Sequence, residues 1–330
     1  HINNSEVLIP KLKCIQNFPE LMNFNLRLSY FNQKMSSKIN EKEKIVLKID
    51  RTDVLYSSFN ELQKLDSIDW LKSFKISFIG EIGIDEGGLT NEWFSLIVKE
   101  ILNPKNNLFI LTENKSYQPN PLNQDIDHFK LIGMIFSRLL IQRQCVNAHL
   151  SKSFYRQILH QCIKFDDLKD YDEEIYESLQ NLFNIDVDFL DLNFTIDVNK
   201  NGENKTILLC ENGDDISVTN ENIKEYVSLY TNYHLKKSII NQIDSFKEGF
   251  NSLIQTEEIG IFTPDELDLI ICGKQTIDVN DLRKYTKYEF PYHKKHKVIL
   301  MFFNVISKWD NEKLSKFLLF LTGSSRVPIN

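Results

Sequence analysis

The sequence predicts an α+β protein with more than one lobe, and three observations support this fold class. Helical spacing of apolar residues recurs along the chain, as at Trp93, Phe94, Ile97 and Ile101. Strand-like runs are short and scattered between these helical segments. The 330 residues, of which 42% are hydrophobic and 12% aromatic, exceed a typical single domain and can bury a substantial core.

The first half of the chain predicts an ordered series of elements after a helical N-terminal extension over residues 1–45. They are a strand at 45–49, a helix at 54–65, a strand at 74–79, a helix from Asn91, a short strand at 108–111, a buried helix at 128–143 and a helix from Ser151. Proline lacks a backbone N–H, so Pro119 and Pro121 predict irregular structure over 114–124.

A glycine-containing stretch, GEIGIDEGGLTNEWF at 80–94, has the strand, glycine, helix order of a phosphate-binding loop. Its neighbours are the carboxylates Glu81, Asp85, Glu86 and Glu92, and no cation follows until Lys99. These charges would repel a phosphate. The favoured interpretation is a structural turn, in which Gly87 and Gly88 supply positive φ angles and Glu92 complements the helix dipole.

The second half predicts a small subdomain followed by more helices. After an acidic run at 166–177 come a helical stripe to Phe183, a strand at 190–196, a turn at 199–204 and a returning strand at 206–210. The expected later helices are a region at 219–253 bent or broken near Gly249, one begun by the 263–266 signal and ended by Gly273, and a final pair at 298–309 and 311–321. Asp310 and Gly323 are expected to cap the last helix, and Pro291 indicates a linker.

Composition argues against several functions. A net charge of −7 leaves no basic stripe for nucleic acid, and no apolar run approaches the roughly 20 residues of a membrane span. Five scattered cysteines, Cys14, Cys145, Cys162, Cys210 and Cys272, form no pair or cluster with metal-ligand spacing. We therefore expect no metal, free thiols in a reducing compartment, and each cysteine to be a small buried hydrophobic residue.

Several blocks resemble the catalytic domain of HECT-type ubiquitin ligases. The stretch GEIGIDEGGLTNEWFSLIVKEIL resembles its start, with the pattern E-x-G-x-D-x-G-G-x-x-x-E. YQPNP (117–121), LSKSFYRQIL (150–159), ENGDDISVTNENIKEYVSLY (211–230), FKEGF (246–250), FTPDELDLIICG (262–273) and FLLFLTGSSRVP (317–328) resemble later blocks in the same order. The resemblance covers roughly residues 46–330 and is highly specific, because several independent blocks match.

The resemblance implies a bilobal domain. A large N-lobe would comprise 46–170 and 231–284, a small subdomain at 171–230 would dock a ubiquitin-conjugating enzyme, 285–292 would be the hinge, and 293–330 would begin an incomplete C-lobe. Leu179, Phe183, Tyr226 and Tyr230 match positions that line the docking groove, although a role in the subdomain core competes for the aromatics. The hinge would contain Glu289, Phe290, Pro291 and Tyr292; with proline in place of glycines, we expect a narrower swing.

The implied activity is ubiquitin transfer to substrate lysines through a cysteine thioester, with a conjugating enzyme, ubiquitin and protein substrates as partners and no cofactor. The resemblance implies a cytoplasmic or nuclear location. It places the nucleophile in a Thr-Cys-Phe-type motif expected after Asn330, so the chain alone is expected not to form a thioester. The last cysteine, Cys272, lies in an apolar helix pattern typical of a core residue. The alternative is a non-catalytic module that binds a conjugating enzyme; a cysteine hydrolase is disfavoured because no Cys/His/Asp pairing is visible.

Overall fold

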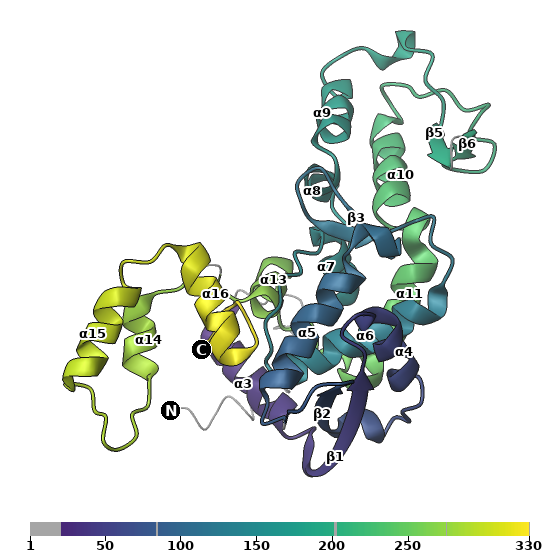
Figure 1. Cartoon of the computed structure of the whole chain (residues 1–330). Coiled ribbons are helices and arrows are strands. Elements are labelled where there is room, and N and C mark those ends of the chain that lie inside the picture. The colour runs from purple at the N-terminus through teal and green to yellow at the C-terminus, as the bar shows by residue number, and fades with distance from the viewer. Residues whose placement is uncertain (1–20, 84, 201–202, 275, 330) are drawn as a thin grey trace. The chain divides into compact units, whose positions relative to one another are not determined.

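The computed structural model describes residues 21–83, 85–200, 203–274 and 276–329, and most of its regular structure is helical (Figure 1). The helices are α3 (Phe24–Ser36), α4 (Val54–Leu62), α5 (Gly88–Ile101), α6 (Ile126–Ile141), α7 (Lys152–Ile158), α8 (Leu168–Tyr171), α9 (Glu173–Leu182), α10 (Ile223–Leu235), α11 (Ile240–Leu253), α12 (Thr256–Ile259), α13 (Pro264–Cys272), α14 (Val279–Tyr285), α15 (Lys297–Ile306) and α16 (Asn311–Thr322). The strands are β1 (Asn40–Ile49), β2 (Lys72–Phe78), β3 (Phe109–Leu111), β4 (Tyr117–Pro119), β5 (Thr195–Lys200) and β6 (Glu203–Leu208). The predicted α+β class is confirmed.

Contacts within the chain divide it into two units. Unit 1 combines the described part of His1–Arg27 with Ile101–Ser137 and His149–Leu267. Unit 2 combines Leu28–Glu100, Arg138–Ala148 and the described part of Asp268–Asn330. Because both units are assembled from separated segments, neither corresponds to a continuous stretch of sequence.

In unit 2, β1 and β2 form a parallel pair joined through α4, with Lys44 opposite Ser73 and Ile49 opposite Phe78. Parallel strands need such a crossover connection. Period-two patterning turns Phe74, Ile76 and Phe78 inward, where each is at most 2% exposed. Beside them the Arg138 guanidinium lies 4.4 Å from the centre of the Phe74 ring and donates to the Trp70 and Lys72 carbonyls, while burial lowers its pKa to about 10.

The turn before α5 is built by Asp85. This buried carboxylate accepts hydrogen bonds from the N–H groups of Ile76, Gly87 and Thr90 and from the Thr90 hydroxyl. Gly87 has a φ of 108°, as expected, but Gly88 does not have a positive φ and already begins the helix. The helix therefore starts three residues before the predicted Asn91, because Asp85 accepts from the Thr90 N–H in its first turn and from the Gly87 N–H just before it. The interpretation as a structural turn agrees with this geometry.

Carboxylates near this turn also pair with a cation from a distant part of unit 2. Arg51 donates to Glu81 and Glu92 and lies 3.9 Å from the centre of the Phe78 ring. The sequence did not indicate this ion pair, because 30 residues separate Arg51 from Glu81.

Helices α6 and α11 approach each other closely in unit 1. A Cβ atom added at Gly133 would lie 2.0 Å from the Phe246 carbonyl oxygen, and one added at Gly249 would lie 1.9 Å from the Lys130 carbonyl oxygen. The predicted helix break near Gly249 is wrong: the glycine lies inside α11 and permits this contact. The chain instead breaks at Lys236, which ends α10 before the short 3-10 helix η8 (Lys237–Ile239).

Two further predictions from sequence are wrong. Segment 114–124 contains β4, which pairs antiparallel with β3 and places Pro119 opposite Phe109. Proline is tolerated there because it ends a short strand, and Asn120 N–H continues the pairing by donating to the Leu108 carbonyl. The extension predicted over 1–45 includes α3 but also the start of β1 at Asn40; residues 1–20 lie outside the described residues.

The remaining helix signals agree with the structure. In α13, Glu266 N–H donates to the Thr263 hydroxyl while Thr263 N–H donates to the Glu266 carboxylate, and Gly273 follows the helix with a φ of 64°. Asp310 caps α16, which ends at Gly323. Within the described ranges, no helix is both long and apolar enough to cross a membrane.

Candidate protein-docking subdomain

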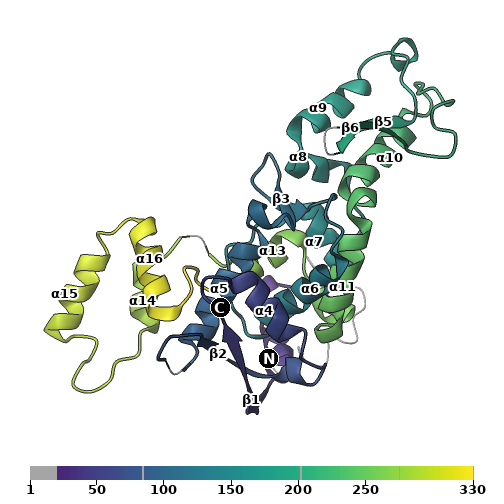
Figure 2. The same cartoon turned by 45° about the vertical axis from the view of Figure 1, so that its right-hand side comes forward.

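The small subdomain of unit 1 is formed by α8, α9, the β5–β6 hairpin and α10 (Figure 2). The hairpin strands pair antiparallel from Thr195 opposite Leu208 to Lys200 opposite Glu203. The predicted strand at 190–196 is misplaced, because β5 begins only at Thr195. Before it, Phe194 N–H donates to the Gly213 and Ile216 carbonyls of a loop rather than to a neighbouring strand.

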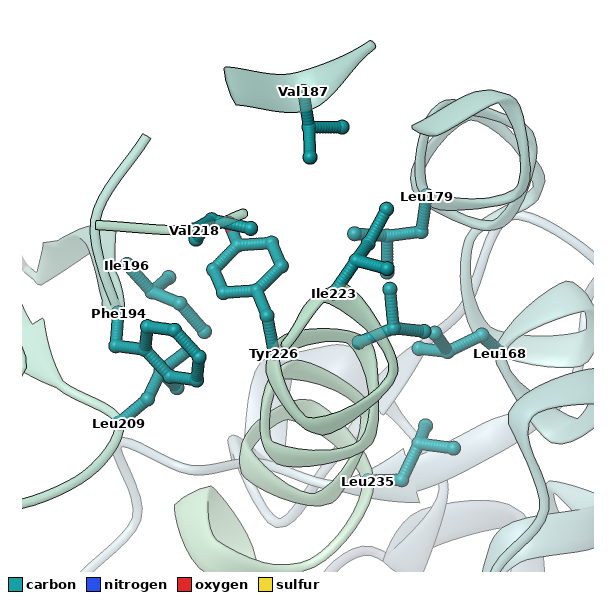
Figure 3. Packing of buried hydrophobic residues seen from close by; sticks show 11 residues of the cluster. Leu168, Leu179, Val187, Phe194, Ile196, Leu209, Val218, Ile223, Tyr226 and Leu235 are labelled. Atoms are coloured by element: carbon teal, nitrogen blue, oxygen red, sulfur yellow. The ribbon is translucent and has the colours of Figure 1, made fainter. Parts of the chain in front are cut away.

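An apolar core holds these elements together (Figure 3). Its buried members are Leu168, Leu179, Val187, Phe194, Ile196, Leu209, Val218, Ile223, Tyr226, Val227 and Leu235. They come from α8, α9, β5, α10 and the segments between these elements, and helix α10 supplies the largest share. The core therefore fixes the position of α9 and of the hairpin against α10.

The structure separates the four predicted docking residues into two groups. Leu179 and Tyr226 are 5% and 6% exposed and belong to the core, where the Tyr226 ring lies 5.5 Å from that of Phe194. Tyr230 is partly buried beside Tyr226, at a ring distance of 5.9 Å. Phe183, at the end of α9, is 44% exposed. Of the four, Phe183 therefore offers the largest exposed fraction to a partner.

Aromatic stacking continues along α10 from Tyr230. Its ring stacks on His234 at 4.9 Å, and Tyr171 of α8 lies 5.7 Å from the same imidazole. Burial lowers the pKa of His234, against the opposing effect of Asp172. Burial also raises the pKa of Tyr226 to about 12. This face of α10 therefore carries neutral aromatic groups at neutral pH.

Exposed apolar residues continue beyond Phe183. Ile185, Phe189 and Leu190 are 48%, 83% and 41% exposed, and together with Phe183 they form what we call the apolar edge. Sequence reasoning assigned no role to the last three. A signal was present, because these apolar residues stand among Asp186, Asp188 and Asp191 after α9 has ended at Leu182. Four exposed large apolar side chains within residues 183–190 make this segment a candidate interaction surface.

The cysteines differ in their suitability as nucleophiles. Cys145 and Cys272 are buried, and burial raises the pKa of Cys145 to about 12 and that of Cys272 further still. Both thiols are therefore protonated and unreactive at neutral pH. Cys162 is exposed and Cys210 half-buried, so the expectation that every cysteine is buried is wrong for Cys162. Cys14 lies outside the described residues.

The core, the hairpin and the apolar edge belong to an α+β protein whose small subdomain carries exposed apolar side chains. The chain belongs to the HECT-domain family, whose model, described as a HECT-domain (ubiquitin-transferase), matches residues 95–330. The resemblance found in the sequence blocks is confirmed.

Characterised relatives share this similarity over most of the chain. Human "E3 ubiquitin-protein ligase NEDD4" is 36% identical over 320 residues, covering 94% of this chain and 24% of the relative. "E3 ubiquitin-protein ligase pub1" of Schizosaccharomyces pombe is 37% identical over 291 residues, covering 86% of this chain and 38% of the relative. "E3 ubiquitin-protein ligase RSP5" of Emericella nidulans is 34% identical, with 93% and 38% covered. The chain thus spans well under half the length of each of these relatives.

Proposed function

We propose that this chain acts in a HECT-type ubiquitin ligase, receiving ubiquitin from a conjugating enzyme and passing it to substrate lysines. The observation that carries the proposal is the family match over residues 95–330, together with relatives named as E3 ubiquitin-protein ligases that align with most of the chain.

The chemistry consists of two acyl transfers. A ligase thiolate attacks the thioester carbonyl carbon of ubiquitin, the new C–S bond forms, and the conjugating enzyme leaves as a thiolate. A substrate lysine amine then attacks the second thioester, forms an isopeptide bond and releases the ligase thiol. A low thiol pKa assists the first step, so Cys145 and Cys272 are unsuited to it. In this proposal the nucleophile follows Asn330.

Segment 171–230 is the proposed dock for the conjugating enzyme. In this proposal Phe183 and its neighbour Phe189 contact the partner, Tyr230 borders that surface, and Leu179 and Tyr226 support it from the core. Their exposed fractions support these roles. Phe183 and Phe189 are 44% and 83% exposed, whereas Leu179 and Tyr226 are almost fully buried. Segment 285–292 remains the proposed pivot before a second lobe that begins at residue 293.

Binding titrations with a panel of conjugating enzymes test the dock. Phe183→Ala is expected to weaken binding by about 1–3 kcal/mol without lowering the melting temperature, as at an exposed interface anchor. Tyr226→Ala is expected to lower both binding and stability, whereas Tyr226→Phe keeps the ring and should preserve both. Tyr56→Ala, at an exposed tyrosine of unit 2 outside the proposed dock and pivot, is the control. Unchanged affinity in Phe183→Ala would remove this residue from the dock.

The same preparations distinguish a ligase from the alternative, a non-catalytic module that binds conjugating enzymes. With activating enzyme and ubiquitin added, we expect the 330-residue chain to show no thiol-sensitive adduct on a non-reducing gel. A longer polypeptide that includes the expected Thr-Cys-Phe motif should show one. If the longer polypeptide formed no adduct but still bound conjugating enzymes, the binding module would be favoured. If the 330-residue chain formed an adduct that Cys272→Ala abolished, Cys272 would be the nucleophile.

A further inference from the structure

A cavity of about 640 Å³ lies within unit 1, lined by the end of α7 and the residues after it, by α10 and by α11. This volume is in the range of ligand-binding pockets. Of the four predicted docking residues, Phe183 alone lines this cavity. The cavity therefore adjoins the docking positions at Phe183 and shares Val227 with the core that supports them.

Positive charge surrounds the cavity, although the whole chain has a net charge of −7. Lys224, Lys236 and Lys247 line it, with Asp244 as the one carboxylate among the described lining residues. Asp244 already lies 3.4 Å from the Lys247 ammonium. Within the described chain, Lys224 and Lys236 have no carboxylate partner and remain available for an anionic ligand.

The cavity lining combines an apolar wall with one unused acceptor. Phe165 and the buried Val227 supply the wall. Gln157 is 6% exposed, and its Nε2 donates to the Ser153 and Leu235 carbonyls. Its Oε1 is the one buried side-chain oxygen or nitrogen of the described lining residues that lacks a hydrogen-bond partner. A buried acceptor without a donor is costly, so a ligand N–H at this point would be favourable.

We propose that this cavity binds an acidic peptide segment of a partner protein. An apolar side chain of the peptide packs on Phe165 and Val227, a backbone N–H donates to Gln157 Oε1, and flanking carboxylates pair with Lys224 and Lys236. A peptide supplies these three groups at successive positions, whereas a simple anion supplies only the charge. This peptide site goes beyond the proposed transfer of ubiquitin.

The test is fluorescence anisotropy with the complete chain and a fluorescein-labelled nonapeptide of alternating Glu and Leu. We expect saturable binding that weakens at least tenfold in the Lys224→Glu/Lys236→Glu variant. The matched control is Lys105→Glu/Lys205→Glu, which makes the same charge change at two exposed lysines of unit 1 outside the cavity. A nonapeptide of alternating Lys and Leu should not bind.

A second measurement locates the peptide. Cys162 is exposed and lines the cavity, so bound peptide should slow its alkylation by a maleimide, with Cys162→Ser reporting the background from other thiols. Absence of binding, equal loss in the control variant, or no protection of Cys162 would each overturn the proposal. If succinate competed equally with the peptide, the ligand of the cavity would be a small anion and not a peptide. Binding of conjugating enzymes is measured separately, so its failure is distinguishable from failure here.

Discussion

Two apolar helices, α6 and α15, differ sharply in burial. In α6 of unit 1, Phe129, Ile132 and Phe136 are fully buried, and α11 packs so closely that glycine is required at the contact. In α15 of unit 2, Val298 and Met301 are 54% and 59% exposed, although the helix sequence is almost entirely apolar. Apolar composition thus predicts a helix that can be buried, but the elements packed around it decide how much is covered.

Ionic contacts differ in the same way. Arg27 of unit 1 has a side chain only 3% exposed and donates to both carboxylate oxygens of Glu266 at 2.7 Å. In α16, Lys316 and Glu312 lie 2.6 Å apart, but their side chains are 72% and 78% exposed. The first contact joins residues far apart in sequence, whereas the second lies within one helix and is screened by water.

The largest expected effect comes from breaking the close contact of α6 and α11. Gly249→Ala should destabilise the chain by about 3 kcal/mol or more, because its Cβ would overlap a backbone oxygen that cannot rotate away. Gly88→Ala is the matched control, since nothing lies within 4 Å of an added Cβ and φ is not positive. Urea denaturation measures both; equal stability of the two variants would contradict the close packing.

A smaller effect on stability is expected in the C-terminal helices α15 and α16. Phe303 is 5% exposed in a cluster with Ile306, Leu314 and Leu318, so Phe303→Ala should cost about 2–3 kcal/mol of local stability. Phe320→Ala, at an 85% exposed ring in α16, should leave stability nearly unchanged. Hydrogen exchange over 297–322 reports the local change. Comparable loss of protection in both variants would show that exposure does not separate these phenylalanines.

The smallest of the three effects concerns the buried ion pair and its pH dependence. Burial acts to raise the pKa of Glu266, but hydrogen bonds from Arg27 and from Thr263 outweigh it, and the net pKa is lowered. The resulting stabilisation is complete above the ordinary glutamate pKa of about 4.3 and is lost as pH falls below it. Glu266→Gln should cost about 1–2 kcal/mol at pH 7 and reduce this acid sensitivity.

Melting temperatures between pH 3 and pH 7 test that expectation, with Glu312→Gln as the control at the exposed pair. The control should melt as the unchanged chain does throughout this range. If the melting temperature of Glu266→Gln fell with pH as much as that of the unchanged chain, other carboxylates would be responsible for the acid sensitivity.

Local signals in the sequence determined much of this protein. Capping residues at 263–266, Asp310 and Gly323 determined helix ends, because caps act through backbone groups a few residues away. Blocks of matching residues determined the family. Local rules failed at Gly249 and Pro119, because a glycine inside a helix and a proline at a strand end acquire their meaning from the neighbouring element.

Only the tertiary structure decided which apolar and charged residues are available to a partner. Leu179, Phe183, Tyr226 and Tyr230 are similar in sequence pattern, but packing buries Leu179 and Tyr226 and leaves Phe183 exposed. Likewise, folding brings Gln157 of α7 to one cavity with Lys224 of α10 and with Lys236, which caps the end of α10. Hydrophobic periodicity determines which face of an element is apolar, whereas burial and charge clustering depend on long-range contacts that no local pattern specifies.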